Sequence, residues 1–295
     1  MWFNPPPALL TRVEYRLPEK LRRNARTPWS DANRRGELLH SVLEGPCLDR
    51  DGRLYVVDIP FGRIFGVSER GWDIIAEYDG WPNGLKVLPS GRLLVADYKN
   101  GLVEVDPATG GTQPVLATLA SEAFKGLNDL TLGRDGSVLF TDQGQTGLHD
   151  PTGRVWRLRP SGEIDRLISN APSPNGIVLN HANTHAYVAM TRSCQIWRFE
   201  LRPDGLVNKV QCFAQLPGGL SGPDGLAMDS RDRLYVCDPA HGCVWVLDRY
   251  GVPLLRIVTC AGAVLTNICL SHDEKTLFIT DAETGSVLAC DLPDY

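Results

Sequence analysis

Apolar and polar residues alternate along most of this chain in short runs separated by turn residues. In one recurring pattern, a polar turn rich in Asp, Gly or Asn precedes a run of β-branched and other apolar residues ending in Asp. Five copies end at Asp58, Asp97, Asp142, Asp238 and Asp281, and a degenerate sixth, HANTHAYVAM, ends at Met190. This alternation between turn residues is typical of β-strands joined by tight turns.

A second strand-like run follows each copy: GRIFGV, GLVEVD, GRVWRL, CQIWRF, GCVWVL and GSVLAC. Six units of about 40 to 50 residues have the size of propeller blades. A sandwich would not explain the sixfold recurrence, and no amphipathic helix of ordinary length interrupts it. The pattern therefore predicts an all-β, six-bladed β-propeller. The expected blades are residues 37–80, 81–120, 125–170, 174–217, 221–260 and 265–295.

The last unit ends one strand short, at Tyr295. A further strand-like run, LTRVEYRLP, lies at residues 10–18. Pairing this run with the last unit would close the ring and remove an exposed sheet edge. We therefore expect residues 1–295 to form one propeller domain closed by an N-terminal strand.

Composition narrows the classes of function. The net charge is -5, which argues against a nucleic-acid binder because such proteins usually carry a basic patch. No apolar run approaches the roughly 18 residues of a membrane span, and the N-terminus lacks the features of a signal peptide. The eight cysteines are scattered without a CxxC motif. We therefore expect a reduced, cytoplasmic protein that contacts neither nucleic acid nor membrane.

A polar residue opens each repeat, where the innermost strand of a blade begins at one mouth of the central channel. The six residues are Glu44, Asn83, Asn128, Asn175, Asp224 and Asn267, spaced 39 to 49 residues apart. Singly, Asn or Asp beside Gly makes a turn, but turns do not explain a polar residue at the same position six times. Oxygen ligands without His or Cys suit a hard divalent cation. A cation would also relieve the repulsion between the two carboxylates.

Four motifs carry a resemblance over about residues 37–291. They are EGP at 44–46, ND at 128–129, PNG at 174–176 and GPDG at 222–225. In order and spacing they resemble the SMP-30 family of gluconolactonases, regucalcins and luciferin-regenerating enzymes. The resemblance implies a propeller that binds one divalent metal ion (Ca, Zn, Mg, Mn or Fe(II)) through Glu44, Asn175 and Asp224. Asn128 would be a further ligand or a substrate contact.

The implied reaction is metal-assisted hydrolysis of a lactone or similar ester by water. Asp224 is the expected general base, with Asp129 as the alternative. Two other classes of function stay open: a phosphotriesterase of the diisopropylfluorophosphatase kind, and a non-enzymatic metal-binding propeller.

Loops at the same mouth are expected to wall the substrate pocket, and the longest of them, QGQTGLHDPTG, is a candidate lid. Sugar-lactonase relatives often carry Arg two residues before the ND asparagine, where this chain has Gly126. Together with aromatic residues in the loops, Gly126 predicts a less hydrophilic substrate than gluconolactone. The expected substrate contacts are Asn83, Asn128, Asn267, Phe61, Tyr98, Lys125, Gln143, His149, Arg192 and His241.

Overall fold

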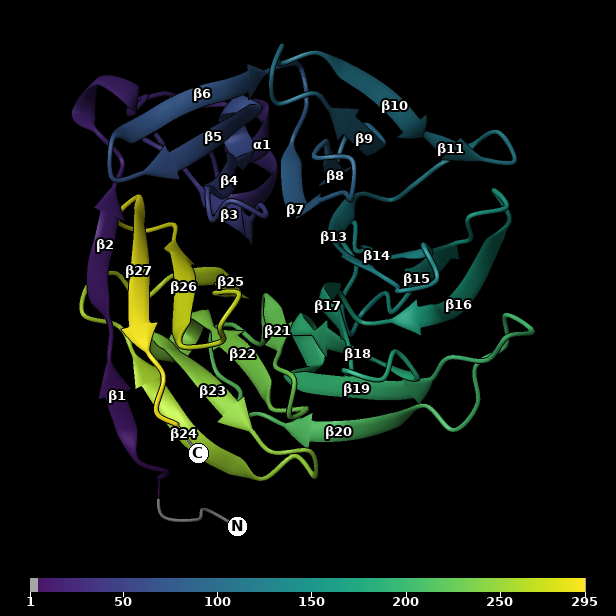
Figure 1. Ribbon diagram of the computed structural model, residues 1–295. Coiled ribbons are helices and arrows are strands. Elements are labelled where there is room, and N and C mark those ends of the chain that lie inside the picture. The colour runs from purple at the N-terminus through teal and green to yellow at the C-terminus, as the bar shows by residue number, and fades with distance from the viewer. Residues whose placement is uncertain (1–4, 295) are drawn as a thin grey trace.

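The computed structural model describes residues 5–294 and has the predicted all-β propeller architecture. Six antiparallel sheets stand around a central axis, and their innermost strands surround the channel (Figure 1). The innermost strands are β3 (Leu43–Leu48), β7 (Pro82–Val87), β13 (Leu127–Leu132), β17 (Pro174–Leu179), β21 (Leu226–Met228) and β25 (Leu265–Leu270). The propeller prediction is therefore confirmed.

Each inner strand pairs with a second strand, which holds the recurring apolar run, and a third strand follows outside it. The second strands are β4 (Leu54–Asp58), β8 (Leu93–Asp97), β14 (Val138–Asp142), β18 (His185–Met190), β22 (Leu234–Asp238) and β26 (Thr276–Asp281). The third strands are β5 (Arg63–Ser68), β9 (Gly101–Val105), β15 (Gly153–Leu158), β19 (Gln195–Glu200), β23 (Cys243–Leu247) and β27 (Ser286–Asp291).

The first five blades continue outward to a fourth strand of their own. These strands are β6 (Gly71–Glu77), β10 (Thr112–Leu116), β16 (Ile164–Ala171), β20 (Gln211–Gln215) and β24 (Pro253–Val258). A small hairpin, β11 (Thr118–Leu119) with β12 (Glu122–Ala123), links blades two and three. The helical elements are α1 (Pro28–Asn33) and the 3-10 turns η1 (Glu19–Leu21), η2 (Ile59–Phe61), η3 (Thr191–Ser193) and η4 (Pro239–His241).

The N-terminal segment closes the ring, as predicted, but it does so in two places. Strand β2 (Arg12–Arg16) pairs antiparallel with β27 and completes blade six. Strand β1 (Ala8–Leu10) pairs in parallel with β24 as a fifth strand of blade five. The segment therefore spans the junction between these two blades and covers both of their outer edges.

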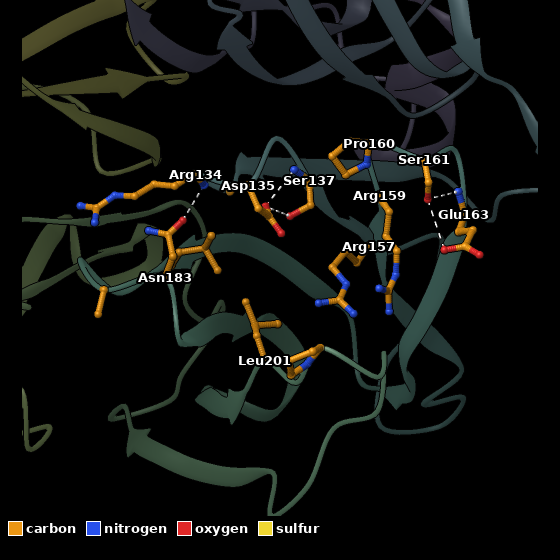
Figure 2. A pocket seen from close by; sticks show the side chains of 14 residues that line it. Arg134, Asp135, Ser137, Arg157, Arg159, Pro160, Ser161, Glu163, Asn183 and Leu201 are labelled. Atoms are coloured by element: carbon orange, nitrogen blue, oxygen red, sulfur yellow. Dashed lines mark hydrogen bonds between the residues drawn. The ribbon is translucent and has the colours of Figure 1, made fainter.

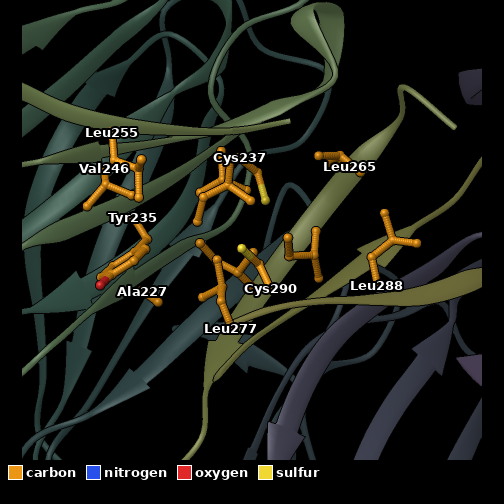
Figure 3. Close-up of a cluster of buried hydrophobic side chains, with 13 residues drawn as sticks. Ala227, Tyr235, Cys237, Val246, Leu255, Leu265, Leu277, Leu288 and Cys290 are labelled. Atoms are coloured by element: carbon orange, nitrogen blue, oxygen red, sulfur yellow. The ribbon is translucent and has the colours of Figure 1, made fainter. Parts of the chain in front are cut away.

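Apolar side chains fill the spaces between neighbouring blades. Between blades five and six, Tyr235 and Val246 belong to the same buried cluster as Leu277 and Leu288 (Figure 3). Cys237 lies in that cluster with no disulfide, so it acts there as a small apolar residue. Within residues 5–294, no helix is long and apolar enough to cross a membrane.

In blades one, three and six, the Asp that ends the recurring run holds the loop before the inner strand. Asp58 accepts a hydrogen bond from the backbone N–H of Val42 at 2.8 Å, and Asp142 accepts one from Gly126 at 3.0 Å. Asp281 does the same for Gly262 at 2.9 Å. These aspartates are fully buried. In these three blades the Asp is therefore structural, because it fixes where the inner strand begins.

Candidate metal and substrate site

Five of the six polar residues predicted at the channel mouth lie at equivalent positions. In each blade, the last residue of the second strand pairs with a residue of the inner strand, and the polar residue comes next in the chain. Three such pairs are Leu43–Asp58, Leu127–Asp142 and Pro174–Met190. A β-bulge interrupts the ladder immediately afterwards. The five residues at this position are Glu44, Asn83, Asn128, Asn175 and Asp224.

The sixth member is Thr266 rather than Asn267. Leu265 pairs with Asp281 in the way that Leu127 pairs with Asp142, which aligns Thr266 with Asn128 and Asn267 with Asp129. The side-chain oxygens of Asn267 and Asp129 each accept a hydrogen bond of 2.8 Å from the next backbone N–H. The predicted equivalence of Asn267 with the other five was therefore wrong by one residue. The motif LTNIC offers two adjacent polar residues, and only the strand register distinguishes them.

In blades one, two, four and five, a glycine follows the polar residue at the channel mouth, where blades three and six have Asp129 and Asn267. A Cβ atom at Gly84 would lie 2.7 Å from the Cα of Asp129, and one at Gly225 would lie 2.5 Å from the Cα of Asn267. Both distances are too short for a real contact. The glycines thus allow neighbouring inner strands to approach closely and leave room for the side chains of Asp129 and Asn267.

Glu44 is a buried carboxylate surrounded by other acids. It is 3% exposed and accepts a hydrogen bond of 2.9 Å from Asn267 Nδ2 and another from the Gly45 N–H. Burial raises the pKa of Glu44 well above its ordinary value, and the negative charges of Asp224 and Asp129 raise it further. In the absence of a cation, this site therefore resists full ionisation.

The carboxyl group of Asp224 lies near the same acids, but Asp224 is only partly buried. Burial raises its pKa to about 7, a hydrogen bond from the Asn175 side chain opposes the rise, and the charge of Asp129 adds to it. The positive charges of Arg34 and Arg192 also lower the Asp224 pKa, so both guanidinium groups lie within electrostatic reach of it.

Two amide oxygens at this site have no hydrogen-bond partner. Asn128 Oδ1 and Asn175 Oδ1 are buried without one, although Asn128 Nδ2 donates to Gln143 Oε1 at 2.9 Å. Buried polar atoms are almost always paired. Two unpaired carbonyl oxygens beside two carboxyl groups fit the oxygen ligands of a hard divalent cation. No cluster of three or more His, Cys, Asp or Glu suited to a metal occurs in residues 5–294, so amide oxygens would supply part of the ligand set.

Asp129 follows Asn128 in the inner strand, and both of its carboxylate oxygens accept hydrogen bonds. Its Oδ1 accepts from the Leu130 N–H at 2.8 Å, and its Oδ2 accepts from the Ile177 N–H at 3.3 Å. Burial lowers the pKa of the neighbouring Lys86, but the charge of Asp129 raises it, and the resulting pKa lies above the usual lysine value. Burial likewise raises the Asp129 pKa, against the charge of Lys86.

Lys86 was missed in the sequence. It lies in the inner strand β7 in the run PNGLKV, where the equivalent residues of blades four and five are Val178 and Ala227. A charged residue inside an apolar inner strand was the available signal, and aligning the blades would have found it.

Tyr98 occupies the space beside Gly126. A Cβ atom at Gly126 would lie 2.5 Å from Tyr98 Cζ, and the Gly126 φ of +146° disfavours other residues as well. The Tyr98 ring also packs 5.8 Å from the ring of Trp81. At the position where sugar-lactonase relatives often carry Arg, this site therefore presents a tyrosine from the adjacent blade.

The other predicted contact residues differ in their surroundings. Gln143 bonds Asn128 directly and donates to Ser173 Oγ at 3.0 Å. Phe61, in contrast, packs between the guanidinium groups of Arg23 and Arg63, at 5.6 and 5.2 Å from its ring centroid.

Four of the remaining predicted contacts lie outside the strands and are exposed: Lys125, His149, Arg192 and His241. His241 Nδ1 lies 2.9 Å from Asp238 Oδ2. Asn83 is buried at the start of β7.

The segment around α1 is the largest feature of the mouth that the sequence did not reveal. Thr27 and Ser30 form a capping box at the start of the helix, which contacts η2 of blade one. At its end, Asn33 Oδ1 accepts a hydrogen bond of 3.2 Å from Gln145 Nε2, and Gln145 Nε2 lies 3.1 Å from the Tyr98 hydroxyl. A six-residue helix is too short to produce a recognisable periodic pattern.

A large surface pocket lies between blades three and four, on the face of the propeller opposite the candidate site. It has a volume of about 570 Å³ and is lined by Arg134, Arg157, Arg159 and neighbouring residues (Figure 2). Residues 133–137 in its wall follow the end of β13, whereas Asn128 lies at the beginning of that strand. Arg157 and Arg159 are both paired with Asp165, at 2.7 and 2.8 Å. This pocket is therefore separate from the candidate site.

Comparisons with known proteins show the family of the chain. Residues 42–283 match the family model of the SMP-30/Gluconolactonase/LRE-like region. A gluconolactonase of Zymomonas mobilis is 31% identical over 67% of this chain, and the match covers 60% of the length of that relative. A lactonase of Staphylococcus aureus, drp35, is 28% identical over 78% of this chain and 72% of its own.

Solved structures show the same fold. A gluconolactonase of Xanthomonas campestris superposes with a TM-score of 0.76 at 25% identity, over 96% of this chain and 99% of its own. A calcium-binding regucalcin of Agrobacterium tumefaciens reaches a TM-score of 0.76 at 19% identity, over 96% of this chain and 94% of its own. Because the family model covers most of the chain, the protein belongs to the SMP-30/gluconolactonase/LRE-like family.

Proposed function

We propose that this protein is a metal-dependent hydrolase that opens a lactone, a cyclic ester, by attack of water. One observation carries the proposal: the unpaired, buried oxygens of Asn128 and Asn175 lie in a site with two carboxyl groups of raised pKa. Relatives named gluconolactonase and lactonase support the reaction class.

Glu44, Asn175, Asp224 and Asn128 would hold the cation. When bound, a divalent cation supplies Lewis-acid polarisation of an ester carbonyl and neutralises developing negative charge. A ligand set made only of oxygens favours a hard cation such as Ca²⁺, Mg²⁺ or Mn²⁺. The hydrogen bond from Asn128 to Gln143 fixes the amide plane, so that Oδ1 is left as the free acceptor.

Asp224 is the better candidate for the general base. Both carboxylate oxygens of Asp129 already accept backbone N–H groups, and Lys86 lies beside it. The carboxylate of Asp224 accepts a proton from water as the water oxygen attacks the carbonyl carbon. When the ring C–O bond breaks, the proton passes to the leaving alkoxide, and the product is a hydroxy acid.

The wall formed by Tyr98 favours a substrate with an apolar portion. The ring covers Gly126 and packs near Trp81, so it presents a flat, largely apolar surface. A bare polyol would leave some hydroxyl groups without partners there. We therefore propose an alkyl- or aryl-substituted lactone in preference to glucono-1,5-lactone.

Removing and restoring the metal tests the proposal. Protein stripped with a chelator receives Ca²⁺, Mg²⁺, Mn²⁺, Zn²⁺ or Fe²⁺ singly, and is assayed on lactones and on aryl phosphotriesters. Lactone turnover that requires one cation is the expected result, and calorimetry should show that Glu44→Gln weakens binding of that cation. Turnover of phosphotriesters alone would indicate a phosphotriesterase. Cation binding without turnover of either would indicate a non-enzymatic propeller.

A further inference from the structure

The side chain of Gln143 joins two neighbouring blades at the channel mouth. Its Oε1 accepts a hydrogen bond of 2.9 Å from Asn128 Nδ2 in blade three. Its Nε2 donates one of 3.0 Å to Ser173 Oγ, in the segment just before the inner strand of blade four. Asn128 and Ser173 are buried, and Gln143 is partly buried. Both ends of the Gln143 amide are therefore engaged by the protein.

The backbone of Gln143 is held in the same way. Its N–H donates to the Gly126 carbonyl at 2.9 Å, and its carbonyl accepts from Thr146 Oγ1 at 2.6 Å. Thr146 Oγ1 in turn accepts a hydrogen bond of 3.2 Å from the Ser173 N–H. Gln143 and Ser173 are thus connected twice, through the amide and through Thr146. These bonds hold the Gln143 amide in one orientation, with its oxygen toward Asn128.

The equivalent position of blade four shows that joining two blades does not require an amide. Gln143 and Thr191 each follow the last residue of a second strand, and their backbone N–H groups bond to the segments before their own inner strands. Thr191 reaches blade five through its hydroxyl, which donates to the Pro223 carbonyl at 2.8 Å. A hydroxyl is therefore enough for the contact between blades. The amide of Gln143 provides an acceptor for Asn128 in addition.

This acceptor decides which end of the Asn128 amide faces the candidate cation site. Because Nδ2 is bonded to Gln143, Oδ1 is left buried without a partner, like Asn175 Oδ1. An asparagine side chain that turns over exchanges its oxygen for an NH₂ group, which has no lone pair to offer a cation. Loss of the acceptor at Gln143 would remove the contact that prevents Asn128 from turning over.

We propose that Gln143 is a positioning residue of the cation site: held by Ser173, it keeps the carbonyl oxygen of Asn128 directed at the cation. This inference rests on the proposed function and concerns the affinity of the same site for its cation. Residues that orient a metal ligand through a hydrogen bond typically contribute about 10–100-fold to metal affinity.

Calorimetric titration of chelator-treated protein with Ca²⁺, Mg²⁺ and Mn²⁺, each alone, tests the inference. Gln143→Met has a similar length but no strong acceptor, and it should raise the Kd of the cation that the intact protein binds by about 10–100-fold. Gln143→Glu keeps an acceptor for Asn128, and the Ser173 hydroxyl can donate to its second oxygen. The Glu variant should therefore bind the cation at least as tightly as the intact protein. Equal weakening by both variants would overturn the inference.

Gln195→Met is the matched control. Gln195 lies in the third strand of blade four and is partly buried, as Gln143 is. It also accepts and donates through one amide, from Trp197 Nε1 at 2.8 Å and to Gln215 Oε1 at 3.0 Å. Because these partners lie in the outer strands of the blade, the control should leave the Kd of the cation unchanged.

A double-mutant cycle distinguishes positioning of Asn128 from a role in joining the blades. If Gln143 acts through Asn128, Gln143→Met should raise the Kd no further in protein that already carries Asn128→Ala. A loss of affinity as large as in the intact background would show that Gln143 only joins the blades, and would overturn the inference.

The orientation of the Asn128 amide can also be measured without a cation. In the metal-free protein, hydrogen exchange of the Asn128 side-chain amide, followed by NMR, should be slow in the intact protein and in Gln143→Glu and faster in Gln143→Met. If calorimetry shows no cation binding to the intact protein, the proposed function fails, and this measurement still decides whether Gln143 orients Asn128. Exchange in the intact protein as fast as in exposed asparagine side chains would overturn the inference.

Discussion

Asp224→Asn should stabilise the metal-free protein at alkaline pH. The pKa of Asp224 rises from 3.8 to about 7 in the folded chain, chiefly through burial. A raised carboxyl pKa means that the folded state binds the proton more tightly than the unfolded state. The stabilising contribution is therefore complete below about pH 4 and is lost as the pH rises through 7. Above pH 7 the folded chain holds an unfavourable, partly buried charge, which asparagine does not carry.

The magnitude follows from the pKa difference. Each pKa unit corresponds to about 1.4 kcal/mol, so a rise from 3.8 to about 7 amounts to about 4 kcal/mol in the free energy of unfolding. Asp224 is only partly buried, so solvent screens its charge, and asparagine changes the hydrogen bonding to Asn175. About half of this gain is therefore a reasonable expectation. For a chain of 295 residues, about 2 kcal/mol corresponds to about 3 °C in Tm.

Thermal denaturation followed by circular dichroism measures this effect. Chelator-treated wild type and Asp224→Asn are melted at pH 5 and pH 8, and Asp51→Asn, the same change on an exposed turn, serves as the control. The variant should exceed wild type in Tm at pH 8 and show a smaller gap at pH 5. Saturating cation should reverse the order, because wild type then gains binding energy that the variant lacks. A metal-free variant that melts below wild type at pH 8 would refute the conclusion that the charge of Asp224 is unfavourable in the folded chain.

Three further predictions concern activity, the pocket wall and ring closure. With saturating cation, Asp224→Asn should lower kcat by about 10²–10⁴, and retention of more than a tenth of wild-type kcat would exclude Asp224 as the base. Gly126→Ala should destabilise the fold by about 1–3 kcal/mol, because Gly126 has a positive φ and the Tyr98 ring lies where the Cβ atom would be. In chemical denaturation, adding Tyr98→Ala should recover part of the lost stability, and no recovery would show that the ring is not the obstacle. Deleting residues 1–17 removes β1 and β2 and exposes the edges of blades five and six; the truncated chain should melt lower and aggregate, and an unchanged Tm would contradict closure by this segment.

The sequence was sufficient to predict the propeller because a blade is a local unit. Its strands are consecutive in the chain, and the alternation of apolar residues and the repeated Asp recur in almost every unit. The same regularity predicted the polar residues at the channel mouth. Five of them hold equivalent positions in the structure: Glu44, Asn83, Asn128, Asn175 and Asp224. Properties that repeat with the blade can be found by aligning the chain with itself.

Tertiary structure decided what does not repeat. The choice between Thr266 and Asn267 depended on the register of blade six, in which Leu265 pairs with Asp281. The covering of Gly126 by Tyr98 depended on contact between two blades. The position of Arg34 depended on a short helix that a hydrogen bond to Gln145 holds at the mouth. Such contacts join residues far apart in sequence, and their energies depend on packing and burial, which local patterns of apolar and polar residues do not encode.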